Sequence, residues 1–222
     1  MNLPPSYVGR TGDAIASEDC FIDSIGGLYR SMSWIDHYDR FQKFPSLLYA
    51  CIEARFAIEY LIFEEIILGT GCRLTQGEYR KCLKEGQLEK SLKKIVPDYE
   101  KLSEFTLLVA EQDPELPKIV TVKPKDLMKS WGKLSQYLHW FGSKDEKAEN
   151  PDWLRETAAN IRGIVSPLWE LLTSARRGIM HPEDMHPKVR EIWIAFKEER
   201  INKESAKFQI NYMEAAVRGS ST

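Results

Sequence analysis

The segment from Pro45 to Leu68, PSLLYACIEARFAIEYLIFEEIIL, decides the fold. Apolar residues cover most of its helical circumference, which is typical of a helix near the middle of a bundle. Pro45 suits a first helical turn, and Gly69 suits the end of the helix. Charged residues interrupt the apolar run and argue against a membrane span: Glu53, Arg55, Glu59, Glu64 and Glu65. The segment therefore predicts a buried helix in a helical protein.

Further helices are predicted along the rest of the chain. Apolar spacing, capping residues and prolines indicate the ranges 28–41, 75–95 with a break near Gly86, 97–109, 126–141, 150–175, 189–200 and 203–217. Thr75-Gln76-Gly77-Glu78 has the form of a capping box, and Asn202 suits the cap of the last helix. Gly26 and Gly27 leave the start of the first of these helices open, and residues 142–150 predict an exposed loop. Ser166-Pro167 leaves open whether 150–175 is one kinked helix or two abutting ones. Residues 118–122, KIVTV, predict a single extended connector or a small hairpin arm. Phe208, Ile210 and Tyr212 alternate, so a strand is an alternative to the last helix.

These segments predict an all-α fold, an antiparallel helical bundle with extra helices and at most a short β element. The 222 residues suffice for one substantial core. We expect a single domain: an N-terminal arm and short helix over 1–43, a bundle core over 44–186, and a helical extension over 187–222. Proline, glycine and small polar residues in 1–20 predict a poorly structured arm.

The composition narrows the classes of protein that fit. A net charge of -2 gives no global attraction to nucleic acid or acidic membranes, so an anion-binding surface has to be local. The four cysteines, none in C-x-x-C spacing, are expected to be unpaired in a reducing cytoplasm: Cys20, Cys51, Cys72 and Cys82. The first residues lack the apolar segment of a secretory signal. Dinucleotide, P-loop and nucleophile-elbow motifs are missing, and we expect no cofactor and no membrane contact.

The segment Ser174–Lys188, SARRGIMHPEDMHPK, gathers the groups best suited to chemistry. A histidine with a pKa of about 6.5 takes or gives a proton near neutral pH. An arginine stays charged and matches phosphate oxygens. Metal-free RNA cleavage needs such a base and such a cation. We therefore interpret His181 as a candidate proton-transfer group, and Arg176 and Arg177 as candidate phosphate-binding groups.

Local geometry decides which arginine accompanies His181. In an unbroken helix, Arg177 and His181 are four residues apart and share a face, whereas Arg176 points away. Gly178 and Pro182 indicate that the helix loosens here, which would allow either arginine. A structural interpretation competes, because arginines in a last turn interact with the helix dipole and Gly178 is an ordinary helix stop.

Residues 176–181, RRGIMH, resemble the R-x4-6-H signature of HEPN domains, with the usual apolar flanks at Ala175 and Ile179. Upstream, IEARFAIEYLIFEEI over 52–66 is similar to the early HEPN helix with its A-R-x-A-x-E pattern. The resemblance covers these two helices, and it makes Arg176 the motif arginine and His181 the motif histidine. Arg177 stands where the family often has a small polar residue.

The resemblance implies a HEPN-like helical bundle that forms a homodimer. Many HEPN domains are metal-independent endoribonucleases of toxin, defence or RNA-processing systems, and others only bind. An RNA substrate and a protein partner such as an antitoxin follow from the same resemblance. The alternative is a non-catalytic helical protein-interaction or regulatory module, in which Arg176 and Arg177 only close a helix.

A metal site would use His181, Asp184 and His186 as ligands. This set is short, borne on a loop and lacks a distant partner, so we expect no metal. Residues 182–184 instead predict a solvated turn, and His186 is predicted to precede a helix that starts at Pro187.

Two further groups of residues are candidates for a site. Lys125, Lys129 and Lys133 form a basic stripe at i, i+4 and i+8 that could follow a phosphate backbone, although a solvated helix face is the more common explanation. Arg55 and Glu59 are four residues apart, and we expect them to form a supporting ion pair along the central helix.

Overall fold

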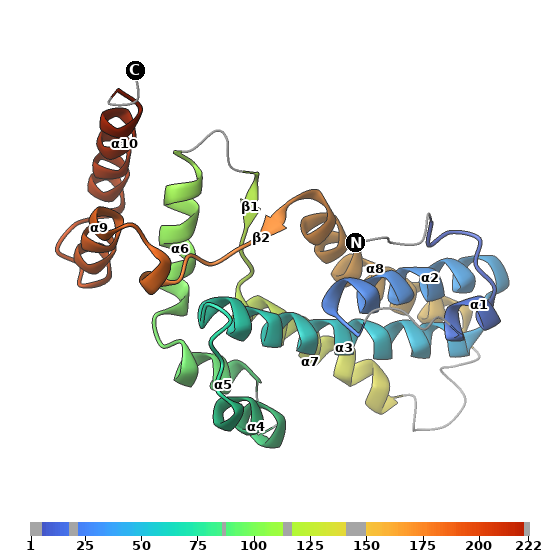
Figure 1. Ribbon diagram of the computed structural model, residues 1–222. Coiled ribbons are helices and arrows are strands. Elements are labelled where there is room, and N and C mark those ends of the chain that lie inside the picture. The colour runs from blue at the N-terminus through green and yellow to red at the C-terminus, as the bar shows by residue number, and fades with distance from the viewer. Residues whose placement is uncertain (1–5, 18–21, 86–87, 113–116, 141–149, 220–222) are drawn as a thin grey trace. The chain divides into compact units, whose positions relative to one another are not determined.

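The computed structural model describes residues 6–17, 22–85, 88–112, 117–140 and 150–219. Over these residues the chain is all-α apart from one short β element, which confirms the predicted fold class (Figure 1). Most of the predicted loop at 142–150, and the predicted break near Gly86, lie outside the described residues.

The contacts within the chain divide it into two compact units. Unit 1 comprises Met1–Leu61 and Pro124–Ser174, and unit 2 comprises Ile62–Lys123 and Ala175–Thr222. The domain boundaries expected after residues 43 and 186 stay a prediction. The two units are described separately below.

Unit 1 contains α1 (Gly12–Ala16), α2 (Ser24–Phe41), the first part of α3 (Phe44–Gly69), α7 (Pro124–Trp140) and α8 (Pro151–Ser174). α3 agrees with the helix predicted from the central apolar segment. α8 runs through Pro167 as one helix, which decides between the two alternatives for this region. Cys51 of α3 donates a hydrogen bond from its thiol to the Leu134 carbonyl of α7 at 3.2 Å.

α2 begins at Ser24 and not at the predicted Leu28. The Asp23 side chain accepts the N–H of Gly26 at 2.6 Å and so caps the helix. A β-carbon added to Gly27 would lie 2.9 Å from the β-carbon of Ala57 in α3. The glycine that obscured the helix start in the sequence therefore allows two helices to pack closely.

Part of the predicted N-terminal arm is helical. Residues 12–16 form α1, which the Thr11 hydroxyl caps by accepting the N–H of Ala14 at 3.2 Å. Ile15 is buried, and the ring of Tyr7 meets Trp169 of α8 edge-on, with 6.1 Å between the ring centroids. These apolar contacts correct the expectation of a poorly structured arm over its described residues.

Unit 2 contains the rest of α3, α4 (Gln76–Glu85), α5 (Leu88–Ile95), α6 (Tyr99–Ala110), β1 (Ile119–Val120), β2 (Arg176–Arg177), the 3-10 turn η1 (Pro182–Asp184), α9 (Pro187–Lys197) and α10 (Lys203–Gly219). The predicted capping box precedes α4: the Thr75 hydroxyl accepts the N–H of Glu78, whose carboxylate accepts the N–H of Thr75. Phe105 of α6 is fully buried in the core, against Trp193 and Phe196 of α9.

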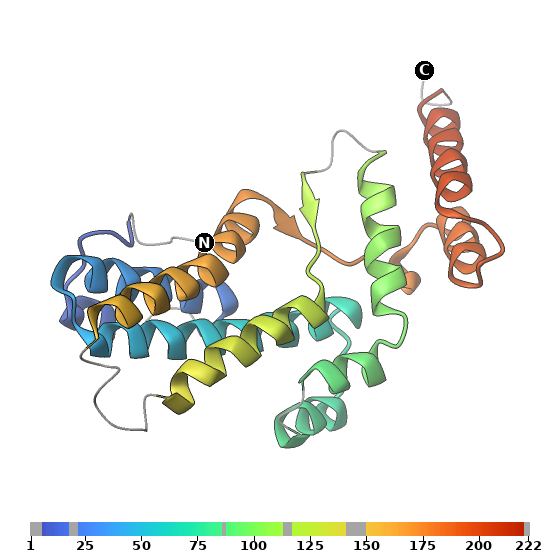
Figure 2. The same cartoon turned by 180° about the vertical axis from the view of Figure 1, so that it is seen from behind.

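β1 and β2 lie side by side as a two-stranded parallel sheet, in which Ile119 pairs with Arg176 and Val120 with Arg177 (Figures 1 and 2). The prediction of a single connector or a hairpin arm at residues 118–122 is therefore wrong. The partner strand lies far along the chain, in the residues that follow α8. No local pattern reveals a pairing between segments so far apart in the sequence.

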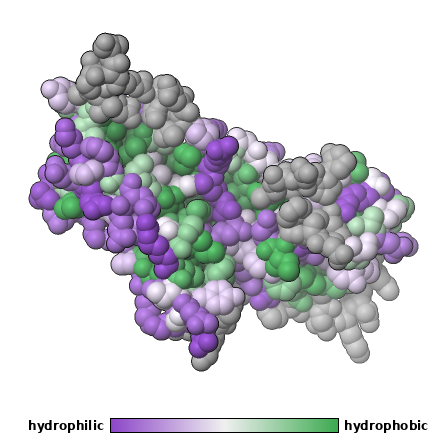
Figure 3. All heavy atoms as spheres, in the orientation of Figure 1, coloured by the Kyte–Doolittle hydropathy of each residue, from purple (hydrophilic) through white to green (hydrophobic). Residues whose placement is uncertain are grey.

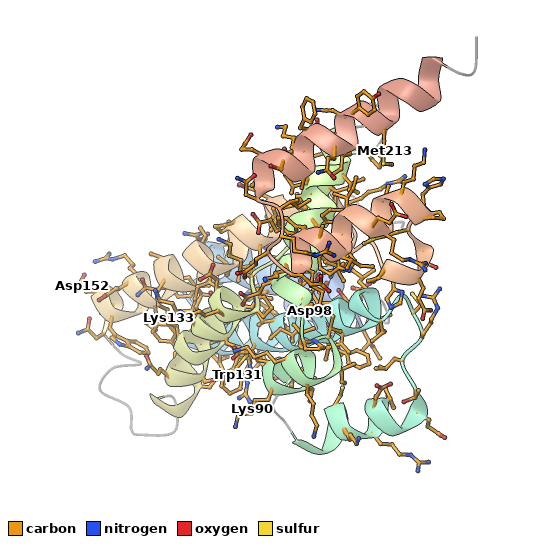
Figure 4. All side chains as sticks on the ribbon, turned by 90° about the vertical axis from the view of Figure 1, so that its left-hand side faces the viewer. Lys90, Asp98, Trp131, Lys133, Asp152 and Met213 are labelled. Carbon is orange, nitrogen blue, oxygen red and sulfur yellow. The ribbon has the colours of Figure 1, made fainter. Side chains whose placement is uncertain are left out.

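Residues 203–219 form a helix, which excludes the alternative of a strand there. The Asn202 side chain accepts the N–H of Ser205 at 2.9 Å, as its predicted capping position requires. Ala206 and Ile210 are buried in the unit 2 core. Met213 also packs against this core, and Figure 4 shows it on the side of α10 that faces α9 and α6.

The surface of the molecule mixes hydrophilic and apolar side chains, as Figure 3 shows for one face. Across the described ranges, no helix combines the length and the apolar character that a membrane crossing needs. Three of the four cysteines fall in these ranges, and none of the three forms a disulfide: Cys51, Cys72 and Cys82.

Candidate functional site

The segment Ser174–Lys188 is not helical beyond its first residue until α9 begins at Pro187, apart from one 3-10 turn. α8 ends at Ser174, Arg176 and Arg177 lie on β2, and the chain then reaches His181 just before η1. The helix that would place Arg177 and His181 on one face therefore does not form. Successive side chains of a strand point to opposite faces, so the two arginines diverge. Arg176 is exposed, and its backbone N–H donates to the Lys118 carbonyl at 2.9 Å.

Arg177 is held by two glutamates of α3. Its guanidinium donates to Glu65 at 3.3 Å and forms a close ion pair with Glu64. The side chain of Glu65 is 1% exposed, and that of Arg177 is 18% exposed. Because the guanidinium already serves two carboxylates, one of them buried, it is not free to clamp a phosphate.

The buried carboxylate of Glu65 has a second donor in Tyr99 of α6. The Tyr99 hydroxyl lies 2.6 Å from Glu65 and 3.2 Å from the Val122 carbonyl. Burial raises the pKa of Glu65 above its ordinary value of 4.5, against the opposing effects of the Tyr99 hydrogen bond and the Arg177 charge. Burial is also the largest cause of the raised pKa of Tyr99, followed by the charge of Glu65. Arg177 thus belongs to a buried polar cluster of α3, α6 and β2.

His181 pairs with Arg73, which follows α3, and with neither motif arginine. Arg73 Nη1 lies 3.1 Å from His181 Nδ1, and the backbone N–H of Glu183 lies 3.3 Å from the same nitrogen. Both partners can only donate, so this geometry assigns Nδ1 as an acceptor and places the imidazole proton on Nε2. In this arrangement Nδ1 is occupied and Nε2 can only donate, so neither nitrogen is ready to act as a base.

Arg73 is itself engaged by the acidic residues of η1. It donates to Asp184 at 2.5 and 3.2 Å and lies 3.7 Å from Glu183. Hydrogen bonding from Arg73 is the main reason that the pKa of Asp184 is lowered. Gly71, with φ of +58°, permits this close approach, since an added β-carbon would lie 2.9 Å from Cγ of His181. The cluster ties the turn after α3 to η1.

Arg190 of α9 also holds η1. Its guanidinium donates to the Pro182 and Glu183 carbonyls, both at 2.7 Å. The positive charges of Arg73 and Arg190 are matched in number by the negative charges of Glu183 and Asp184. The surroundings of His181 therefore form a neutral structural brace and not a cationic pocket for phosphate.

His186 has the structural position that the sequence predicts. It directly precedes Pro187 of α9, and its Nδ1 lies 3.4 Å from the N–H of Lys188. The proposed ligand Asp184 is instead bound to Arg73. In the part of the chain that the structure describes, no group of three or more His, Cys, Asp or Glu side chains is arranged to hold a metal ion.

Lys125, Lys129 and Lys133 are exposed on α7. A rise of about 1.5 Å per residue separates neighbouring members by about 6 Å along the helix axis. Leu127 and Leu134, on the other side of α7, are buried, so the three lysines face outward. Within the described residues, none of the three takes part in an ion pair.

Arg55 and Glu59 form the predicted pair, with 3.3 Å between Arg55 Nε and Glu59 Oε1. Trp131 of α7 joins them: its indole N–H donates to Glu59 at 2.7 Å, and the Arg55 guanidinium lies 4.5 Å from its ring centroid. Trp131 and Lys133 leave α7 in different directions (Figure 4). The pair therefore fixes α7 to α3 in unit 1, and its support of a catalytic site stays a prediction.

Arg73 is the site residue that sequence patterns missed. It lies 108 residues before His181, and no spacing rule connects the two. Gly71 beside it is a weak signal, because a glycine between two helical segments indicates only a turn.

Comparison with known proteins adds no assignment. No family model matches the chain, and neither a curated protein nor a solved structure matches it.

Proposed function

We propose that this chain is a HEPN-like helical protein that binds the phosphate backbone of RNA and does not cleave it. The observation that carries the proposal is the lysine stripe, defined as Lys125, Lys129 and Lys133 of α7. Its ammonium groups are exposed, regularly spaced and without ion pairs among the described residues. Lysines so arranged neutralise successive phosphates and release counterions, whatever the base sequence.

Many other cations of the chain are already neutralised. Ion pairs with acidic side chains engage Arg30, Arg40, Arg73, Lys93, Lys101, Arg155, Arg162, Arg177, Lys197, Arg200, Lys203 and Lys207. With a net charge of -2, attraction to a polyanion has to come from a local surface. The lysine stripe supplies three such charges in one row.

The contacts of the motif side chains support binding without cleavage. Arg177 is committed to two glutamates of α3, and His181 Nδ1 accepts from Arg73. A general base needs a free nitrogen lone pair, and a phosphate clamp needs a free guanidinium. Arg177 and His181 Nδ1 are both engaged, and the exposed Arg176 points to the face of β2 opposite Arg177. The expected homodimer, antitoxin-like partner and cytoplasmic location belong to the same proposal.

A second candidate function is metal-independent endoribonuclease activity centred on His181, in a toxin, defence or RNA-processing system. The 3.1 Å contact with Arg73 favours it, because it joins a proton-transfer group to a permanent cation. Arg73 would then take the place of Arg176 or Arg177, and Nδ1 would have to be released before catalysis. This candidate predicts that RNA is cleaved in EDTA and that the activity is lost in His181→Ala.

Replacement of all three residues of the lysine stripe by glutamine tests the RNA-binding proposal. Affinity for a labelled single-stranded RNA is measured by fluorescence anisotropy over a range of salt concentrations. Loss of three phosphate contacts should reduce the slope of log affinity against log salt by about 2. Glutamine has a helix propensity close to that of lysine, so α7 should persist.

The matched control replaces Lys93, Lys101 and Lys197 by glutamine. It changes the net charge equally, but each of these lysines forms an ion pair with an acidic side chain. We expect the control to keep the salt slope of the wild type. Equal losses in the two variants, or a wild-type protein without RNA affinity, would contradict the proposal.

A further inference from the structure

The imidazole of His37 lies where three helices of unit 1 meet. His37 belongs to α2 and is half-buried. Its Nδ1 lies 2.9 Å from Oγ of Ser46, in the first turn of α3. α1 packs against α2, and a β-carbon added to Gly12 of α1 would lie 3.6 Å from His37 Nε2 (Figures 1 and 2). Each ring nitrogen therefore faces a different neighbouring helix.

An ion pair of α2 holds the backbone of the N-terminal segment that includes α1. We call residues 6–17 the docked arm. Asp36 Oδ2 accepts the backbone N–H of Gly9 and the Nε–H of Arg40, both at 2.9 Å. Arg40 in turn donates from its guanidinium to the Arg10 carbonyl. The pair thus fixes two successive backbone groups of the docked arm.

The same two charges act on His37, which follows Asp36 in the chain. Burial is the largest cause that lowers the pKa of His37 below its ordinary value of 6.5, and the charge of Arg40 adds to it. The charge of Asp36 opposes both. The neighbours on the other helices, the Ser46 hydroxyl and the Gly12 backbone, carry no charge. A protonated His37 would therefore repel Arg40 and attract Asp36, the two side chains that hold the docked arm.

We propose that His37 is a pH-sensitive latch, which keeps the docked arm closed over a neutral imidazole and opens it when the ring is protonated. In the open state the ring is in water, and the Asp36 carboxylate can turn to it. A helix of five residues is marginal without packing, so α1 melts when the arm opens. The latch lies within unit 1 and is independent of the RNA-binding proposal.

The direction of the pH dependence follows from the closed state. With the arm closed, the pKa of His37 is lowered, whereas a ring in water keeps the ordinary value of 6.5. The stability of the closed arm is therefore fully present above pH 6.5 and is lost as the pH falls through the lowered pKa. Mild acid should open the arm.

Hydrogen exchange of the Ile15 amide, measured by NMR, tests the latch. This amide donates to the Thr11 carbonyl at 3.0 Å, and Ile15 is 1% exposed, so exchange reports opening of the arm. Relative to the intrinsic rate at each pH, exchange in the wild type should become at least about threefold faster between about pH 7.5 and about pH 5.

His37→Gln provides the comparison, because glutamine keeps a hydrogen-bonding side chain but does not titrate. Its Ile15 amide should exchange at the same relative rate at both pH values, and circular dichroism checks that the variant is folded. Exchange in the wild type that does not change with pH would overturn the latch. An equal acceleration by acid in the wild type and in His37→Gln would overturn it as well.

A second pair of variants tests the ion pair at neutral pH. Asp36→Asn weakens the hold on Gly9 and Arg40, and should speed exchange of the Ile15 amide at least about threefold. The matched control is Asp39→Asn, which removes the same charge from α2 but affects a residue paired with Arg162 of α8. We expect the control to exchange as the wild type does. Equal effects of the two substitutions would overturn the assignment of Asp36 as the anchor of the latch.

Discussion

Replacement of Arg177 by methionine should lower the free energy of unfolding by about 3–5 kcal/mol. The change leaves the buried carboxylate of Glu65 without its guanidinium partner, with the Tyr99 hydroxyl still donating to it. Removing one member of a buried ion pair is costly because the remaining charge cannot return to water. Urea unfolding, followed by circular dichroism, measures the effect.

The neighbouring Arg176 provides a matched control. It is exposed on β2, and Arg176→Ala should change the free energy of unfolding by less than about 0.5 kcal/mol. Similar small losses from both substitutions would mean that Arg177 does not hold the buried polar cluster. A large loss from Arg177 alone would identify the second arginine of the motif as structural.

The Arg177 effect should also depend on pH. Burial raises the pKa of Glu65 above 4.5, so the folded protein binds this proton more tightly than the unfolded chain. The stability linked to Glu65 is therefore fully present below pH 4.5 and is lost as the pH rises through the raised pKa. Arg177 lowers this pKa, so removing Arg177 deepens the loss. The difference between wild type and Arg177→Met should shrink as the pH falls from neutral towards 4.5.

Replacement of Phe105 by alanine should destabilise the protein by about 3–5 kcal/mol. Phe105 is fully buried, and its ring centroid lies 5.4 Å from that of Trp193 and 5.7 Å from that of Phe196. The substitution removes these contacts and leaves a cavity between α6 and α9. Urea unfolding at a fixed low protein concentration measures the loss without a contribution from self-association.

Phe208→Ala is the matched control for this prediction. The same side chain is removed, but Phe208 is 71% exposed, so stability at low concentration should change by less than about 0.5 kcal/mol. A loss as large as that of Phe105→Ala would place Phe208 in the core and contradict the orientation of α10.

Local signals predicted most helices because caps and apolar spacing act over a few residues. The capping pair of Thr75 and Glu78 forms as expected, and so does the cap at Asn202. The start of α2 was missed because Gly27 resembles a helix breaker in the sequence. Gly27 allows α2 to approach Ala57 of α3 closely. Helix propensity describes single residues in one segment, so it cannot predict this contact between two helices.

The candidate site was predictable only in part. A motif specifies the spacing of residues along the chain, but it does not specify which distant residues contact them in the folded protein. His181 was identified as a residue with a charged partner, but that partner is Arg73 and comes from the turn after α3. Arg176 and Arg177 lie on β2, which pairs with β1, so the motif arginines are not helical. Arg177 is also bound by two glutamates of α3. Both outcomes depend on contacts between distant segments.

The most direct test follows the integrity of a labelled RNA during incubation with wild-type protein and with His181→Ala, both in EDTA. Retention of the RNA on each protein is measured in the same samples. We predict that both proteins bind the RNA and that it stays full-length with each. Cleavage by the wild type that His181→Ala loses would contradict binding without catalysis and would establish His181 as a catalytic residue.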